Sequence, residues 1–128
     1  MVTEINDWNE LDDVRNGLSD DYILGNDLDE NTAGYSSIAG PSANGGSGFN
    51  PIGSSSSEFI GSFDGQDNEI SDLFIDRTSG SFPPPLGLFT EIGNGGSIKN
   101  LGITDFDITG SDSVGVFAAF QTKSTITN

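Results

Sequence analysis

The chain contains no cysteine and no histidine. The lack of cysteine excludes a disulfide framework and leaves the redox compartment open. The lack of histidine removes the usual general base and the most common metal ligand in proteins. The sequence also has no run of about 18 apolar residues, which is the length that a membrane-spanning helix needs. We therefore expect a chain that is not an enzyme, with no catalytic residues, no cofactor and no membrane insertion.

Basic residues are almost absent as well. Arg15, Arg77, Lys99 and Lys123 face 20 acidic residues, which gives a net charge of −16. A surface this acidic repels phosphate groups, so we expect no nucleic-acid partner. Three interpretations of the charge are open: disorder, a calcium-loaded surface, or adaptation to concentrated salt, whose ions screen the repulsion between acids. Periodic apolar residues argue against disorder, and the scarcity of lysine and excess of Asp over Glu favour the high-salt interpretation.

What the sequence does contain is a repeat. Leu86-Gly87-Leu88-Phe89 recurs 28 positions later as Val114-Gly115-Val116-Phe117. Ile98-Lys99-Asn100 recurs at the same spacing as Ile126-Thr127-Asn128. A fixed period of this length indicates one structural unit stacked on copies of itself. We therefore predict a solenoid of about three to four coils, each advancing by roughly the 4.8 Å spacing between strands.

The period also predicts the core. Positions that are 28 residues apart should lie over one another, so that Phe89 stacks on Phe117 and Ile98 stacks on Ile126. We predict a core ladder made of Phe63, Ile70, Leu73, Phe89, Ile92, Ile98, Leu101, Phe117, Phe120 and Ile126.

We interpret residues 1–128 as a single β domain in three parts. Residues 1–30 form an N-terminal cap and first strand. Asp7 to Leu18 form a short helix, with Asp7 and Glu10 at the spacing of a capping box, and Tyr22-Ile23-Leu24 form the strand. Residues 31–58 are rich in Gly, Ser, Asn and Pro and form a long surface loop, pinned to the core by Phe49 and Ile52. Residues 59–128 form the repeat coils.

The repeat resembles a known family. Gly87-Leu88-Phe89 and Gly115-Val116-Phe117, each followed by a turn and then Ile-x-Asn, are similar to the GLUG-motif repeat of bacterial and archaeal surface proteins and adhesins. This resemblance implies a right-handed parallel β-helix and a scaffold or adhesive role, and it carries over no catalytic residue. The chain departs from the motif at its fourth position, where Thr90 and Ala118 replace the usual glycine.

Two pairs of acids are candidate calcium ligands. They are Asp27 with Asp29, and Asp64 with Asp67. Carboxylate oxygens suit calcium, although neither pair has the spacing of a helix–loop–helix site. Aspartates that accept hydrogen bonds from their own turn explain both pairs equally well.

A carbohydrate-binding or polysaccharide-cleaving module is the alternative function. Asp105 and Asp107 alternate along a predicted strand, so they should point to one face as a glycosidase pair does; a solvated acidic face explains them as well. Tyr35, Phe49 and Phe82 are candidate contact residues for sugars or another surface. Loop anchoring is the simpler role for these three aromatic side chains.

The end of the repeat suggests a partner. The last predicted coil stops at Asn128, so Phe117, Phe120 and Ile126 would form an apolar end that other chains of a larger assembly, or further copies in a homo-oligomer, cover. Surface glycans are a second possible partner. Met1–Glu10 lacks the pattern of a secretory signal, which favours a virion part. We predict a non-enzymatic scaffold in an extracellular, cell-surface or virion appendage (a fibre, spike or adhesin) of a halophilic organism or its virus.

Overall fold

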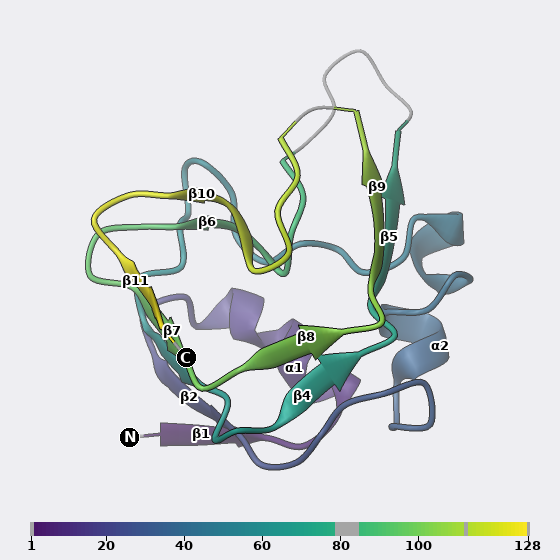
Figure 1. Ribbon diagram of the computed structural model, residues 1–128, viewed down its shortest axis with the longest axis horizontal. Helices are drawn as coiled ribbons and strands as arrows, with labels where there is room; N and C mark the ends of the chain where they lie inside the picture. The colour runs from purple at the N-terminus through teal and green to yellow at the C-terminus, as the bar shows by residue number, and fades with distance from the viewer. Residues whose placement is uncertain (1, 79–84, 112, 128) are drawn as a thin grey trace.

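The computed structural model describes residues 2–78, 85–111 and 113–127 (Figure 1). In chain order the elements are β1 (Val2–Ile5), α1 (Trp8–Asp12), the 3-10 helix η1 (Asp13–Asn16), β2 (Asp21–Leu24), α2 (Tyr35–Ile38), the 3-10 helix η2 (Ala43–Gly46), β3 (Ser62–Asp64), β4 (Glu69–Ser71), β5 (Phe74–Arg77), β6 (Phe89–Ile92), β7 (Ser97–Lys99), β8 (Gly102–Thr104), β9 (Asp107–Gly110), β10 (Ala118–Gln121) and β11 (Thr125–Thr127).

The named strands pair in parallel and form four separate sheets. One sheet has five strands in the order β1-β2-β3-β7-β11. The other three have two strands each, β6 with β10, β4 with β8, and β5 with β9. Each strand is three or four residues long.

This arrangement corrects the predicted architecture. The described residues form four small sheets of short strands, and they do not form the regular right-handed parallel β-helix of uniform coils that we predicted. Within the five-stranded sheet, Val2 pairs with Asp21, Asp21 with Ser62 and Ser62 with Ser97. These steps are 19, 41 and 35 residues long, and only the last step, from Ser97 to Thr125, has the expected 28. The segments between paired strands differ in length, so the chain has no constant period.

The predicted core ladder is right in one place and displaced elsewhere. Ile98 pairs with Ile126, as the period predicted. Phe89, however, pairs with Ala118 and not with Phe117, which lies one residue away. The same offset places Ile92 opposite Gln121 and not opposite Phe120.

The cause of this offset is one additional residue in the later copy. Leu86 pairs with Val114 at the spacing of 28, whereas Phe89 pairs with Ala118 at 29. The period also places Ile70 over Ile98, 28 residues later, and this is wrong, because Ile70 pairs with Ile103.

The N-terminal helix is confirmed, in a shorter form. Asp7 caps α1, and its Oδ1 accepts a hydrogen bond from the backbone N–H of Glu10 at 2.9 Å. Trp8, Leu11 and Val14 are fully buried, because their spacing places them on one face of the helical turns. Figure 1 shows α1 inside the outline of the strands, behind β8. Among the described residues, no helix combines the length and hydrophobicity that a membrane span requires.

Residues 31–58 are more ordered than the predicted loop. They contain α2 and η2, and Phe49 and Ile52 are fully buried, so the predicted pinning of this segment to the core is confirmed. Gly48, at φ +75°, lies so close to β5 that an added Cβ would fall 2.0 Å from the carbonyl oxygen of Phe74. Only glycine fits this crossing without rearrangement.

Candidate functional site: the apolar face of the outer strands

The strands β8, β9, β10 and β11, which we call the outer strands, each pair with one other named strand in the part of the chain that the structure describes. Their partners β4, β5, β6 and β7 are the inner strands. Each outer strand therefore has one edge on which no described strand makes a ladder. A parallel sheet edge of this kind can accept another strand.

Apolar side chains on the two sets of strands match in position but differ in burial. Ile70 and Ile75 on the inner strands are both fully buried. They pair with Ile103 and Ile108 on the outer strands, which are only partly buried. The outer strands thus repeat the core positions of the inner strands without an equivalent cover.

In two further pairs of aligned residues, the inner residue is also buried and its outer partner is more exposed. Ile98 is 1% exposed, whereas its neighbour Ile126 is partly exposed. Leu86 is fully buried, whereas Val114, which pairs with it, is 46% exposed. We define the apolar face by the outer residues of these pairs and by two apolar neighbours at the start of β10 and just before it. The residues are Ile103, Ile108, Val114, Phe117, Ala118 and Ile126.

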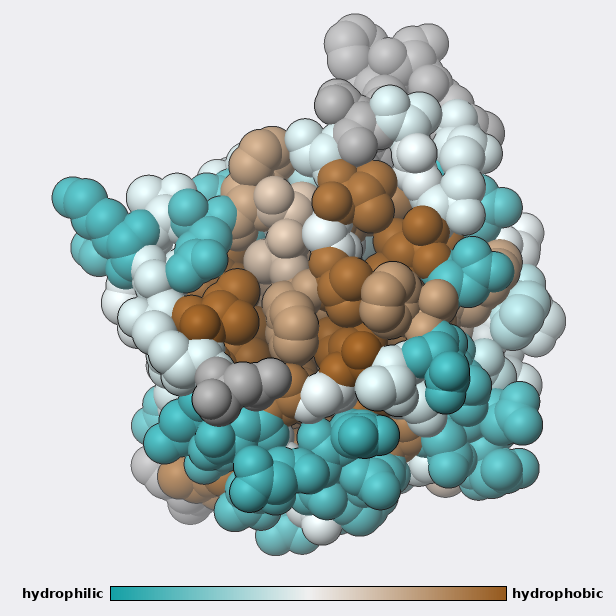
Figure 2. Space-filling view, in the orientation of Figure 1, coloured by the Kyte–Doolittle hydropathy of each residue, from teal (hydrophilic) through white to brown (hydrophobic). Residues whose placement is uncertain are grey.

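Figure 2 shows this face of the molecule directly. Hydrophobic residues form a continuous area in its centre, and hydrophilic residues border that area below and to the left. A contiguous exposed apolar area with a polar border is typical of an interaction surface. The apolar face is therefore the candidate functional site, and what it can do is pack against another surface.

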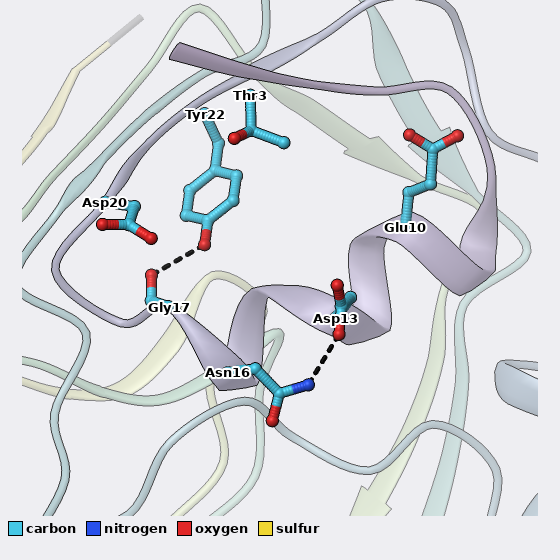
Figure 3. Close-up of a pocket in the computed structure, with 7 residues that line it drawn as sticks. All are labelled: Thr3, Glu10, Asp13, Asn16, Gly17, Asp20 and Tyr22. Carbon is cyan, nitrogen blue, oxygen red and sulfur yellow. Dashed lines mark hydrogen bonds between the residues drawn. The ribbon is translucent and has the colours of Figure 1, made fainter. Parts of the chain in front are cut away.

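Acidic residues gather on a different part of the molecule. Glu10, Asp13 and Asp20 line a hollow of about 260 Å³ beside α1 and β2 (Figure 3). The hydroxyl of Tyr22 lies in the same hollow and donates a hydrogen bond to the carbonyl oxygen of Gly17 at 2.7 Å. Burial raises the pKa of Tyr22 above its usual 10.0, and the charges of Asp20 and Asp13 raise it further. This hollow concentrates negative charge, which concentrated salt would screen.

The predicted calcium ligands accept hydrogen bonds in the structure. Asp27 accepts one from the backbone N–H of Glu69 at 2.8 Å, and Asp29 accepts one from that of Asn31 at 2.8 Å. Asp64 accepts one from the backbone N–H of Gln66 at 2.9 Å and lies 3.8 Å from the amine of Lys99.

Asp67 stands at φ +64°, in a turn. No group of three or more acidic side chains with the geometry of a metal site occurs in the described residues. Turn formation accounts for the positions of Asp29 and Asp64, whereas Asp27 accepts from β4, 42 residues away in the sequence. Calcium binding stays a prediction.

The three predicted contact aromatics have different positions. Tyr35 is partly buried, packs against Trp8 with ring centroids 5.8 Å apart, and donates from its hydroxyl to the carbonyl of Asp72 at 2.7 Å. Phe49 is fully buried, so it is not available to a ligand and that assignment is wrong. Phe82 lies outside the described residues.

The predicted carboxylate pair does not have the expected geometry. Asp105 lies at φ +50° in the bend between β8 and β9, whereas Asp107 begins β9. The two residues therefore do not alternate along one strand. The premise that placed both carboxylates on one face is wrong.

Seven of the ten predicted core residues are buried. Phe63, Ile70, Leu73, Phe89 and Ile92 are fully buried, and Ile98 and Leu101 are 1% exposed. The remaining three, Phe117, Phe120 and Ile126, are on the outer part of the fold, where Phe120 is 46% exposed. Sequence reasoning identified Phe117 and Ile126 as members of an apolar end but missed Ile103 and Ile108, which the displaced pairing brings to the same face.

No protein-family model and no solved structure matches the chain. The resemblance to the GLUG-motif repeat therefore stays a prediction. The chain is 40% identical over 118 residues to Halomucin of Haloquadratum walsbyi, an alignment that covers 92% of the chain and 1% of that protein. It is 35% identical over 99 residues to a protein of Evansella cellulosilytica provisionally named as a Gly-rich membrane protein, covering 77% of the chain and 10% of that protein. The chain thus spans a small fraction of the length of the curated relatives that it matches.

Proposed function

We propose that the chain is a non-enzymatic structural module of a halophile surface protein, and that it assembles through its apolar face. The exposure of that face is the observation that carries this proposal. Several of its apolar side chains pair with buried residues of the inner strands, but the described part of the chain covers them only in part. A surface built in this way gains free energy when a partner covers it, at about 25 cal/mol per Å² of apolar area removed from water.

The comparisons support a surface protein in a high-salt setting. One relative is named Halomucin, and the other is named as a membrane protein. The charge of −16 agrees with this setting, because concentrated ions screen the repulsion between acidic side chains.

The finer form of the proposal is an extracellular appendage, such as a fibre, spike or adhesin. Both relatives come from cellular organisms. This favours a cell-surface appendage over a virion appendage. The carbohydrate-cleaving alternative loses its main support, because Asp105 and Asp107 do not share a strand.

The partner that fits the apolar face is a second copy of the chain in a homo-oligomer, presenting parallel strands that carry apolar side chains. The pairing between inner and outer strands is the pattern that such a partner would continue. Its strands would satisfy the free edges of β8 to β11, and its side chains would cover Ile103, Ile108 and Ile126.

Self-association of the isolated chain tests this proposal. We expect the chain to form dimers or larger species in molar KCl through the apolar face, and Val114→Asp to shift it to monomer in sedimentation velocity. The matched control is Ile60→Asp, because Ile60 is 45% exposed and Val114 is 46% exposed, but Ile60 lies outside the apolar face. The control should leave association unchanged. If the wild-type chain is monomeric at high concentration, or if both variants weaken association equally, the proposed assembly surface is wrong.

A further inference from the structure

A small hollow of about 250 Å³ lies between β5, β6 and the segment that precedes β3. Its residues are distant in the sequence from the acids of Figure 3. One of them is Arg77, which forms no ion pair with a carboxylate in the described part of the chain. The other lining residues are Asn50, Pro51, Gly53, Ser54, Ser55, Pro85 and Thr90.

The state of Arg77 is unusual for this chain. Its Nε is buried and makes no hydrogen bond within the described residues. A buried donor without a partner destabilises the fold, because it has lost its hydrogen bonds to water. Acidic residues outnumber basic ones by 20 to 4, so a partly buried guanidinium without an acidic partner stands out.

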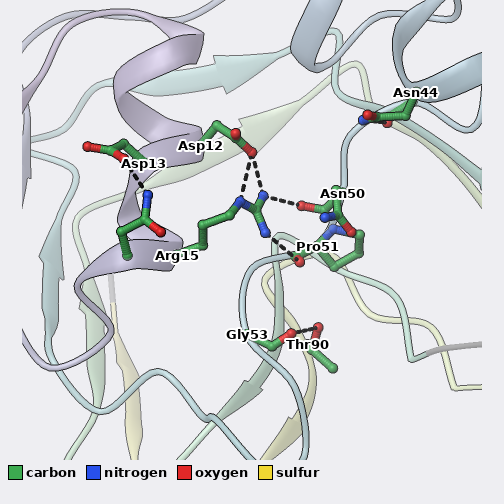
Figure 4. A network of polar contacts seen from close by, with 10 residues as sticks. Asp12, Asp13, Arg15, Asn44, Asn50, Pro51, Gly53 and Thr90 are labelled. Carbon is green, nitrogen blue, oxygen red and sulfur yellow. Dashed lines mark hydrogen bonds and ion pairs between the residues drawn. The ribbon is translucent and has the colours of Figure 1, made fainter.

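The neighbouring Arg15 shapes the wall of the hollow. Arg15 forms an ion pair with Asp12, and its guanidinium also donates to the backbone carbonyls of Asn50 at 2.8 Å and Pro51 at 3.4 Å (Figure 4). These bonds hold the 50–51 segment in place beside Arg77. Thr90 supports the same wall from β6, where its hydroxyl donates to the carbonyl of Gly53 at 2.9 Å.

The electrostatic environment of Arg77 favours an anion. Burial lowers the pKa of its guanidinium, and the positive charge of Arg15 lowers it further. Arg15 has Asp12 as its counter-ion, whereas Arg77 has none among the described residues. An oxyanion in the hollow would provide that counter-ion and accept a hydrogen bond from the unpaired Nε–H, since guanidinium groups bind carboxylate and sulfate through paired N–H donors.

We propose that this hollow binds an oxyanion, a carboxylate or a sulfate, carried by a small hydroxylated molecule such as a sugar acid or a sugar sulfate. Arg77 would bind the anionic group. The hydroxyls of Ser54 and Ser55 would bind the ligand's hydroxyls, and the rings of Pro51 and Pro85 would contact its apolar side. The volume is below the roughly 300–1,000 Å³ of pockets for drug-sized ligands, so the hollow suits a single sugar unit.

The test is a titration of the whole chain with glucuronate, glucose 6-sulfate, inorganic sulfate and glucose, followed by NMR at the Arg77 Nε–H resonance and by calorimetry. We expect glucuronate or glucose 6-sulfate to move that resonance at concentrations where glucose does not, and the stronger of the two identifies the oxyanion. Saturation by inorganic sulfate at the same concentrations as the sugar ligands would mean an ion site without a sugar contact and would overturn the proposal.

Variants separate this site from the general charge of the chain. Arg77→Gln should weaken binding by about ten- to a hundred-fold, the range for a lost charge-assisted hydrogen bond. Arg77→Lys keeps the charge but loses the paired donors, so it should bind with intermediate affinity. The control is Lys123→Gln, which removes the same charge at an exposed position and should leave binding unchanged. Equal weakening by Arg77→Gln and Lys123→Gln, or no shift at Arg77 with any sugar ligand, would contradict the proposal.

Discussion

At one end of the molecule Trp8 and Leu11 of α1 are fully buried, whereas at the other end Val114 and Phe120 are each 46% exposed. Both ends border the same stack of parallel strands, because β1 and β11 are the two edges of the five-stranded sheet. The end with α1 carries its own cover, a capped helix with an apolar face. The end with the outer strands repeats apolar core positions but has no such helix among the described residues. This difference is the basis for our proposal that a partner covers the second end.

The largest expected effect compares one aligned pair of isoleucines. Ile75 on β5 is fully buried, and Ile108, which pairs with it on β9, is partly buried. Ile75→Ala should lower the free energy of unfolding by about 2–5 kcal/mol, and Ile108→Ala by about half as much or less in the monomer, because less area leaves water there. Urea unfolding at fixed salt measures both.

This pair also sharpens the comparison between the two ends. If the apolar face is covered in an assembly, Ile108→Ala should cost more in the assembled state than in the monomer, whereas Ile75→Ala should cost the same in both. Equal losses from the two variants in the monomer would show that the outer strands are as well covered as the inner ones, and the distinction between the ends would fail.

Features that depend on residues close together in the sequence were predictable from it. The helix at Asp7 follows from a cap and a short apolar spacing, and the strand at Tyr22 follows from a β-branched and aromatic run. Burial of Phe49 under the long segment was also predictable as an anchor. The strand β1 was missed, since its four residues carry only two apolar side chains and are mostly exposed.

Pairing between distant strands was much less predictable. The 28-residue period correctly placed Ile98 beside Ile126, where the connecting segments in the two copies have the same overall length. It failed for Phe89, where one additional residue shifts the pairing, and for Ile70, whose partner lies 33 residues later. The hollow around Arg77 was not predicted at all, because residues from three separate segments form it and none of them carries a local motif.

Salt should stabilise the fold by an intermediate amount. Glu10, Asp13 and Asp20 share the hollow beside α1, and the net charge is −16. Like-charge pairs cost a few tenths of a kcal/mol each, so screening several of them should add about 2 kcal/mol between 0.1 M and molar KCl. Thermal unfolding against KCl concentration measures this gain.

A double variant locates part of the salt effect at the α1 end. Asp13→Asn with Asp20→Asn should stabilise the chain in low salt and reduce its dependence on KCl. The same number of neutralisations at Asp105 and Asp107, which lie near the outer strands, is the control and should have a smaller effect. A fold equally stable in low and molar salt would remove the support for a high-salt setting.

The smallest expected effect concerns alkaline pH at the α1 end. The pKa of Tyr22 is raised above 10.0 in the folded chain, so the folded state holds the phenol proton more tightly than the unfolded state. Its contribution to stability is therefore fully present below about pH 10 and is lost as the pH rises through the folded-state pKa. Tyr22→Phe should cost about 1 kcal/mol at pH 8, because the bond to Gly17 is lost. The variant should also lose less stability than the wild type between pH 8 and pH 11.

Burial and the charges of Asp72 and Glu30 raise the pKa of Tyr35 as well, so Tyr35→Phe should also reduce the loss of stability at alkaline pH. An unchanged pH dependence in both variants would mean that neither phenol is protected by the fold, and that the end covered by α1 is more open to water than its buried side chains indicate.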